Sequence, residues 1–159
     1  MIHFVGAGPG AADLITMRGH QLLTEADVII YAGSLVNPEL LQYAKASCSI
    51  YNSASMTLEE VIDVMKQAEE KNQMTVRLHT GDPSLYGAIR EQMDQLDKDN
   101  IPYDVVPGVS SFCGAAAALK AEYTLPNVSQ SVIITRMAGK TPVPEKEEIA
   151  LLAAHQATM

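Results

Sequence analysis

One stretch of the chain, residues 75–93, constrains the fold more than any other. Its sequence, TVRLHTGDPSLYGAIREQM, predicts a strand over 75–79, a tight turn at 81–83 and a helix that begins near Tyr86. The glycine allows the backbone to bend sharply or to approach a ligand closely, and the proline ends the strand. A strand that leads through such a turn into a helix places the turn at the carboxyl edge of a parallel sheet. Open α/β folds bind ligands at that edge, so we predict that the turn forms the floor of a small-molecule site.

Polar residues in this stretch leave two questions open. Apolar Val76 and Leu78 alternate with polar Arg77 and His79, which predicts a strand near the boundary of the sheet. His79 could act as a base, although a satisfied histidine in the core or at its rim is the more common outcome. Asp82 could fold the turn back through an Asx-type bond to a nearby amide, or it could present its oxygens to a cationic or hydroxyl-bearing ligand.

The rest of the first 122 residues repeats the pattern of a short apolar strand, a turn and a helix. Strands are predicted at 2–5, 27–31, 48–51 and 101–106. Helices are predicted at 14–26, 37–44, 57–68 and 110–119. Thr16 or Asp13 would cap the first, Asn37 would cap the second, and Thr57 and Glu60 would form a capping box of the third. Such alternation implies an α/β fold with a parallel sheet and right-handed crossovers.

The sequence changes in character after Glu122. A strand is predicted at 132–135, followed by a loop rich in glycine and proline, and then by a helix that Pro144 opens. One strand and one helix cannot bury a core of their own. We therefore expect an N-terminal α/β domain over 1–122, which includes the connecting helix, and the start of an incomplete second α/β domain over 123–159.

The composition excludes several classes of function. The 11 Lys and Arg residues against 19 Asp and Glu residues give a net charge of −8, which is unsuited to binding nucleic acid or an anionic membrane. The two cysteines form no CxxC pair, and the spacing of His3, His20 and His155 is not that of metal ligands. No secretion signal is visible and the longest apolar runs are too short to span a membrane. We expect a soluble, cytoplasmic protein without a metal.

The glycine-rich loop after the first strand invites comparison with dinucleotide-binding proteins. Gly6, Gly8 and Ala11 match the pattern G-x-G-x-x-G/A. That pattern also requires an acidic residue about 20 positions further on, at the end of the second strand. No acid occurs there before Glu39, and Pro9 lacks an amide hydrogen where a donor would be useful. A nucleotide-binding module is therefore a disfavoured alternative.

Three motifs in the same order resemble the signatures of the tetrapyrrole (corrin and porphyrin) methyltransferases. They are VGAGPG with the following DLITMRG and ADVIIYAGSLV, then RLHTGDPSLYGAIREQ, then VPGVSS. YAGSLV, GDPSLYG, VPGVSSF, EYTLP and ITRMAGKTPVPE are similar to the branch of that family that methylates C11 of precorrin-4 or cobalt-precorrin-4 in cobalamin biosynthesis, and another precorrin step is the alternative. The resemblance covers about the N-terminal two thirds of such an enzyme. We therefore expect a C-terminally truncated form, which could be inactive alone.

The resemblance implies S-adenosylmethionine as methyl donor, with S-adenosylhomocysteine as product, bound between two α/β domains. Carried over by motif, the donor contacts fall on Pro9, Thr80, Gly81, Asp82, Leu85, Ser110 and Ser111. Thr80 departs from the second glycine that many relatives have at this position. The tetrapyrrole substrate is expected to contact Tyr31, Ser34 and Tyr86, and its carboxylates are expected to meet Arg136 and Lys140. We also expect a homodimer; no general base is identifiable.

Overall fold

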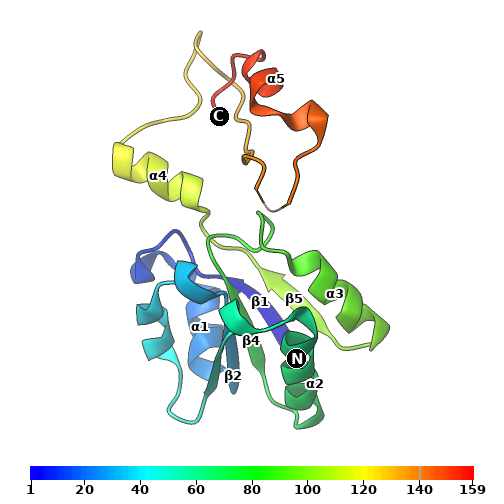
Figure 1. The fold of residues 1–159 in the computed structure, drawn as a ribbon. Coiled ribbons are helices and arrows are strands. Elements are labelled where there is room, and N and C mark those ends of the chain that lie inside the picture. Colours follow the sequence, from blue (N-terminus) through cyan, green and yellow to red (C-terminus); the bar gives the residue numbers. More distant parts are fainter. Residues whose placement is uncertain (140) are drawn as a thin grey trace. The chain divides into compact units, whose positions relative to one another are not determined.

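The structure, a computed structural model, describes residues 1–139 and 141–159 and leaves out the side chain of Ser34. Two predicted substrate contacts, Lys140 and the Ser34 side chain, thus lie outside the described residues. The described chain forms two compact units, residues 1–115 and 116–159 (Figure 1). The predicted division into domains 1–122 and 123–159 stays a prediction.

The first unit is built on a five-stranded sheet in which every pair of neighbours is parallel (Figure 1). The strand order is β3-β2-β4-β1-β5. The strands are β1 (Ile2–Gly6), β2 (Val28–Tyr31), β3 (Ser49–Asn52), β4 (Thr75–His79) and β5 (Tyr103–Val106). The predicted α/β fold with a parallel sheet is confirmed, and all five predicted strands of this part of the chain are present.

Four α-helices connect or follow these strands: α1 (Met17–Glu25), α2 (Leu58–Glu70), α3 (Ile89–Lys98) and α4 (Ser111–Leu119). The caps follow the sequence: the Thr16 hydroxyl accepts from the Gly19 amide at 3.1 Å, and Thr57 and Glu60 form the predicted capping box. Short 3-10 helices complete the connections: η1 (Ala12–Leu14), η2 (Gly33–Leu35), η3 (Pro38–Tyr43) and η4 (Ser53–Ser55). None of the described helices combines the length and apolarity needed to cross a membrane.

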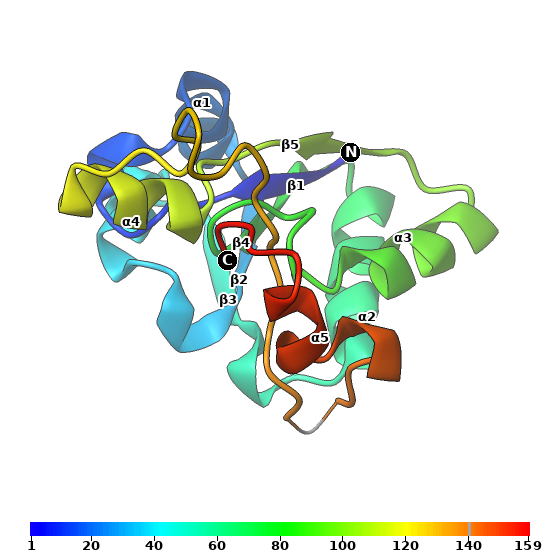
Figure 2. The same ribbon diagram turned by 90° about the horizontal axis from the view of Figure 1, so that it is seen from above.

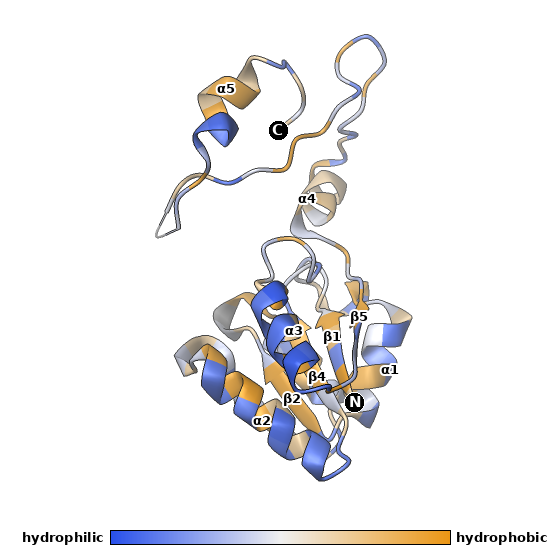
Figure 3. Ribbon diagram, turned by 90° about the vertical axis from the view of Figure 1, so that its right-hand side faces the viewer, coloured by the Kyte–Doolittle hydropathy of each residue, from blue (hydrophilic) through white to orange (hydrophobic). Residues whose placement is uncertain are grey.

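The sheet has a hydrophobic core on each face, because successive strand residues point to opposite faces. Figure 2 shows α1 on one side of the sheet and α2 and α3 on the other. Val5, Ile29 and Val76 belong to the cluster that contains Leu23 of α1. The other cluster joins the intervening strand residues to α2 and α3, through side chains such as Met65. In Figure 3, the ribbon of α2 has both orange (hydrophobic) and blue (hydrophilic) residues, as expected of an amphipathic helix.

The prediction that β4 lies near the boundary of the sheet was wrong. It lies in the middle of the sheet, between β1 and β2, and all five of its residues are buried. Arg77 and His79 face the side of α2 and α3, and Arg77 finds a polar partner in Gln92 of α3. The alternation of polar and apolar residues therefore reflects a buried polar contact and not a solvent-facing strand.

The helix after β4 begins at Ile89 and not near Tyr86. Tyr86 and Ala88 have φ angles of 56° and 50°, in the left-handed region, which a right-handed helix cannot include. The turn after β4 is therefore longer than predicted, and it brings Tyr86 to the surface, where 62% of the residue is exposed.

The second unit differs from its prediction. Residues 132–135 form no strand, and Val132 makes a single parallel bridge with Thr158. The bridge cannot extend because the described part of this unit offers no second strand beside it. The helix predicted from Pro144 is divided into η5 (Glu145–Glu147) and α5 (Ile149–Ala153). No described residue of 116–159 is buried, in keeping with the expectation that so short a segment cannot enclose a core.

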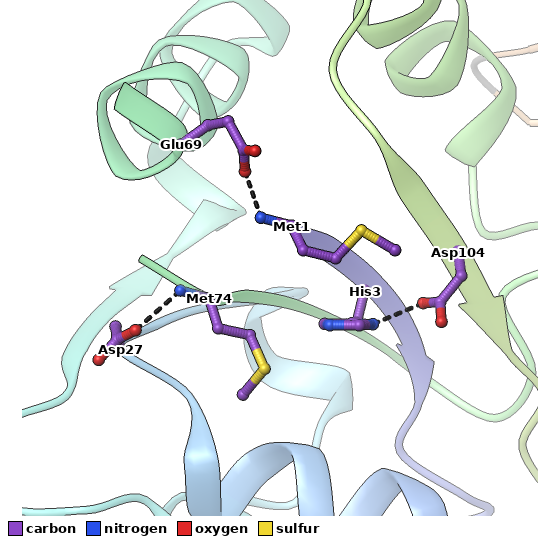
Figure 4. A network of polar contacts seen from close by, with 6 residues as sticks. All are labelled: Met1, His3, Asp27, Glu69, Met74 and Asp104. Carbon is purple, nitrogen blue, oxygen red and sulfur yellow. Dashed lines mark hydrogen bonds and ion pairs between the residues drawn. The ribbon is translucent and has the colours of Figure 1, made fainter. Parts of the chain in front are cut away.

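Polar contacts tie the segments at the amino ends of the strands (Figure 4). Asp27 accepts hydrogen bonds from the Lys45 ammonium at 2.6 Å and from the Met74 amide at 2.8 Å. The bond from Lys45, and then that from Met74, lower the pKa of Asp27 below its usual value. The Met1 amine contacts Glu69. These contacts lie at the edge of the sheet opposite to the predicted ligand site.

Candidate functional site

Three loops meet at the carboxyl edge of the sheet because they leave three neighbouring strands. The loop over 6–10 follows β1, the turn over 80–83 follows β4, and the loop over 107–110 follows β5 (Figure 1). The Gly8 amide donates to the Gly81 carbonyl at 3.2 Å, and the Gly81 amide donates to the Gly8 carbonyl at 3.0 Å. Two loops that are distant in sequence are therefore joined backbone to backbone.

Glycine is required where these loops touch. A Cβ atom on Gly6 would lie 2.5 Å from the Gly108 Cα atom, and one on Gly108 would lie 2.1 Å from the Gly81 carbonyl oxygen. Gly81 itself has a φ of +60°, which glycine adopts without strain. The absence of side chains lets the three backbones approach one another, so the floor of the site consists of peptide groups.

Asp82 fixes the turn and joins it to the loop after β5. Its Oδ1 accepts from the Ser84 amide at 2.8 Å and from the Ser84 hydroxyl, and its Oδ2 accepts from the Gly108 amide at 2.9 Å. Burial alone would raise the pKa of Asp82, but the hydrogen bonds from Ser84 and Gly108 outweigh burial and lower it. The carboxylate is therefore ionised at neutral pH, and the Asx-type bond that the sequence left open is present.

The structure brings most of the predicted donor contacts together at this edge. Thr80 and Gly81 follow β4, and a Cβ atom on Gly81 would be 3.4 Å from both the Ser110 Cα atom and the Ser111 nitrogen. Pro9 packs on the first turns of α4, where a Cβ atom on Gly114 would be 2.5 Å from its Cβ atom. Leu85 also lies in the turn after β4, and its amide donates to the Asp82 carbonyl at 3.2 Å.

The predicted substrate contacts are distributed over both units. Tyr31 ends β2 in the first unit, where its carbonyl accepts from the Ser53 hydroxyl at 3.0 Å. Tyr86 is exposed in the turn after β4.

Arg136 belongs to the second unit and braces its own loop. Its guanidinium donates to the carbonyls of Met137, Thr141 and Pro142 at 3.2, 3.0 and 3.0 Å. The Nε–H and one hydrogen of Nη2 take no part in these bonds, so the side chain keeps donors for an anion.

His79 is a core residue and not a base at the site. It is 3% exposed, its ring stacks on Phe4 with the centroids 6.0 Å apart, and its Nε2 atom has no hydrogen-bond partner among the described residues. Burial, with a smaller effect of the nearby Arg77 charge, lowers its pKa to about 3. The imidazole is therefore neutral at physiological pH, and a ligand in solution cannot reach it.

Sequence reasoning gave Asn37 only a local role as a helix cap. Its Oδ1 does accept from the Glu39 amide at 3.0 Å, but its Nδ2 also donates to the Gly10 carbonyl at 2.8 Å. The amide thus ties η3 to the glycine-rich loop. An asparagine at a cap carries a spare donor, and this is the signal that could have suggested a second contact.

Fold and site together define the class of protein: an open, parallel α/β protein whose candidate small-molecule site lies where glycine-containing loops meet at the carboxyl edge of the sheet. The sequence pattern of the Tetrapyrrole (Corrin/Porphyrin) Methylases matches residues 1–159. The chain belongs to the tetrapyrrole (corrin/porphyrin) methylase family.

Relatives within the family have known names. A cobalt-precorrin-4 C(11)-methyltransferase of Methanocaldococcus jannaschii is 61% identical over 155 residues, which are 98% of this chain and 60% of the relative. An X-ray structure of a cobalamin biosynthetic enzyme, cobalt precorrin-4 methyltransferase, is 46% identical with a TM-score of 0.95, over 98% of this chain and 65% of that one.

A more distant neighbour contains a ligand. It is the uroporphyrin-III C-methyl transferase of Thermus thermophilus in complex with S-adenyl homocysteine, 26% identical with a TM-score of 0.69, over 91% of this chain and 59% of that one. The chain spans about 60% of the length of the curated relatives that it matches.

Proposed function

We propose that this protein contributes to the S-adenosylmethionine-dependent methylation of C11 of precorrin-4 or cobalt-precorrin-4 in cobalamin biosynthesis. The observation that carries the proposal is the meeting of three glycine-containing loops at the carboxyl edge of the sheet. The names of the relatives support the reaction, and the S-adenyl homocysteine complex of a neighbour supports the methyl donor. Methylation at another precorrin step is the alternative within the same family.

The residues at the edge fit such a donor. Gly81 has no Cβ atom to fill the space above the turn, and its neighbours are small or carry hydroxyls. A floor of closely packed backbone with serine hydroxyls beside it suits a ligand that combines an adenosine with an amino acid. The residues that would hold it are Pro9, Thr80, Gly81, Asp82, Leu85, Ser110 and Ser111. When bound, S-adenosylmethionine supplies an electrophilic methyl group on a sulfonium sulfur.

The protein's part in such a reaction is alignment, because transfer of a methyl group to an electron-rich carbon requires no protein nucleophile. Holding two reactants at near-attack distance contributes up to about 7–11 kcal/mol. The paired amides and carbonyls of Gly8 and Gly81, and the bond that Asp82 accepts from the Gly108 amide, fix the floor against which the reactants would be held.

The proposal also includes contacts to the tetrapyrrole substrate. We assign the carboxylates of the tetrapyrrole to Arg136 and Lys140, and its ring system to Tyr31, Ser34 and Tyr86. Residues 123–159 are assigned to the start of a second α/β domain. We further propose that the protein is a cytoplasmic homodimer.

Calorimetry with three ligands in parallel tests the proposed function. S-adenosylhomocysteine should bind, whereas NAD and ATP should bind weakly or not at all. Preference for NAD or ATP would refute the proposed function and favour the alternative of a nucleotide-binding module. The sequence argues against that alternative, because it lacks the acidic residue that the dinucleotide-binding pattern requires.

The substrate assignment is tested by Arg136→Ala. We expect a higher KM for the tetrapyrrole with little change in donor affinity, because a charge that meets substrate carboxylates is lost. Arg136→Lys keeps the charge but cannot brace three carbonyls, so it separates the charge from the loop contacts. Lys146→Ala, at an exposed position of η5, is the matched control. An unchanged KM in Arg136→Ala would remove Arg136 from the substrate site.

A further inference from the structure

Arg77 is a buried cation without a carboxylate partner. It is 7% exposed, and within residues 1–139 and 141–159 no acidic side chain forms an ion pair with it. Its Nε donates to Gln92 Oε1 at 3.0 Å, and its Nη1 donates to the Ile30 carbonyl at 3.1 Å. Burial lowers its pKa to about 10, so the guanidinium remains charged at neutral pH. Because a buried charge is unfavourable, the neutral acceptors that Arg77 finds among the described residues must be held in place.

The charge determines how the Gln92 amide is oriented. Arginine has donors only, so the oxygen of the amide must face Arg77 and the NH2 group must face away. That NH2 group donates to the Ala88 carbonyl at 3.0 Å. Gln92 is 5% exposed; the bond that it accepts from Arg77 is buried, and the bond that it donates to Ala88 is partly buried. The guanidinium polarises the amide and thereby strengthens the bond that the amide donates.

The carbonyl at the end of this chain belongs to the strained part of the turn after β4. Ala88 and Tyr86 have φ values of 50° and 56°, which are unfavourable for residues with a Cβ atom. Gly87 lies so close to Pro83 that an added Cβ atom would be 2.2 Å from the Pro83 carbonyl oxygen. Ala88 precedes α3 without a side-chain cap. The conformation therefore needs support from outside the turn.

We propose that Gln92 is a positioning residue for the ligand site, and that Arg77 fixes its orientation. The Gln92 amide holds the Ala88 carbonyl and thereby keeps Tyr86 and Ala88, within the segment over 83–88, in their left-handed conformations. The inference rests on the proposed function, because this segment carries Leu85 and Tyr86, which are assigned there to donor and substrate. Its physical content, the support of a strained turn by a buried charge, is independent of which ligand binds.

Gln92→Glu separates the two hydrogen bonds of this residue. A carboxylate accepts from Arg77 more strongly than an amide does, but it has no hydrogen to donate to Ala88. We expect a thermal midpoint at least equal to that of the wild type, together with roughly fivefold faster amide exchange over 84–90, which is the factor for one lost hydrogen bond. The Kd for S-adenosylhomocysteine should rise by a similar factor. Gln95→Glu adds the same charge to α3 and should change neither the amide exchange over 84–90 nor the Kd for S-adenosylhomocysteine.

The outcomes distinguish this inference from the proposed function. Unchanged exchange over 84–90 in folded Gln92→Glu would overturn the positioning role. If the wild type does not bind S-adenosylhomocysteine, the proposed function fails, while the exchange comparison still tests the role of Gln92. Should Gln92→Glu not fold, Gln92→Asn replaces it. The asparagine side chain adds no charge and is too short to reach both Arg77 and Ala88. Faster exchange over 84–90 supports the inference, and unchanged exchange refutes it.

Discussion

Gly108→Ala tests whether the meeting of the three loops depends on the absence of a side chain. The added Cβ atom would lie 2.1 Å from the Gly81 carbonyl oxygen and 2.7 Å from the Gly6 Cα atom. Ordinary contact begins at 3.4 Å, so one backbone must move by more than about 1 Å. The Gly81 carbonyl cannot retreat freely, because it accepts from the Gly8 amide. Both neighbours are backbone atoms, and no flexible side chain can absorb the displacement.

The size of the effect follows from two contributions. Overpacking of this kind costs roughly 1–3 kcal/mol. A displaced Gly108 amide also weakens its bond to the Asp82 carboxylate, a charge-assisted bond of roughly 1.5–3 kcal/mol. Because the two effects share one movement they are not additive, and we expect a loss of about 2–4 kcal/mol in the free energy of unfolding.

Urea unfolding of the full chain measures this loss, and calorimetry with S-adenosylhomocysteine measures the effect on the site. Binding should weaken beyond what the loss of folded protein explains, since the floor itself is displaced. Gly139→Ala is the matched control, because its added Cβ atom meets no atom within 4 Å. That variant should remain within about 0.5 kcal/mol of the wild type. If Gly108→Ala is equally stable and binds equally well, the loops do not require the close approach and the reasoning fails.

Two pH-dependent predictions follow from buried or paired groups. His79 has a pKa of about 3 when folded against about 6.5 when unfolded, so the wild type should lose stability as pH falls from about 6.5 toward 3. His79→Leu should remove this dependence, and urea unfolding at pH 7 and pH 5 checks it; an equal loss in both proteins refutes it. The lowered pKa of Asp27 implies a stabilisation that is complete above about pH 4 and is lost as pH falls through the folded pKa. Asp27→Asn should therefore cost about 1–2 kcal/mol at pH 7 and progressively less below pH 4, and a pH-independent difference would contradict the role of the carboxylate.

The local parts of the fold could be predicted because local chemistry determines them. Thr57 and Glu60 form their capping box, and Thr16 caps α1, since each such contact spans only three residues. Gly81 adopts the left-handed conformation that its turn was expected to need. The Asx-type bond from Ser84 to Asp82 is equally local.

Features that depend on distant partners could not be predicted in this way. The central place of β4 depends on the strand order, which alternation of residue types does not encode. The polar Arg77 suggested a strand near the boundary of the sheet because its partner, Gln92, lies fifteen positions further along the chain. The predicted helix start near Tyr86 was wrong because Tyr86 and Ala88 adopt a left-handed backbone conformation that propensity disfavours, with the Ala88 carbonyl bonded to the Gln92 side chain.

The site also combines local and distant contacts in single side chains. Asp82 closes its own turn through Ser84 and holds the loop after β5 through Gly108, and Asn37 caps η3 while it binds the Gly10 carbonyl. Each has one polar atom for a contact that the sequence reveals and another for one that it does not. Sequence patterns therefore mark Asp82 and Asn37 as turn and cap formers, but they do not reveal the contacts of these residues with distant loops.

A site built in this way should respond to substitution differently from one built on ionisable groups. Its floor is made of peptide groups whose positions follow from the pairing of β1 with β4 and β5. Chemistry that depends on alignment loses most when these positions shift, since a misplacement of about 1 Å can cost roughly a hundredfold in rate. The sensitive positions should therefore be Gly6 and Gly108, where no Cβ atom fits, and the residues that hold the loops, such as Asp82. His79, although close in sequence to the turn, should be replaceable without loss of ligand binding, because its imidazole faces the core and not the site.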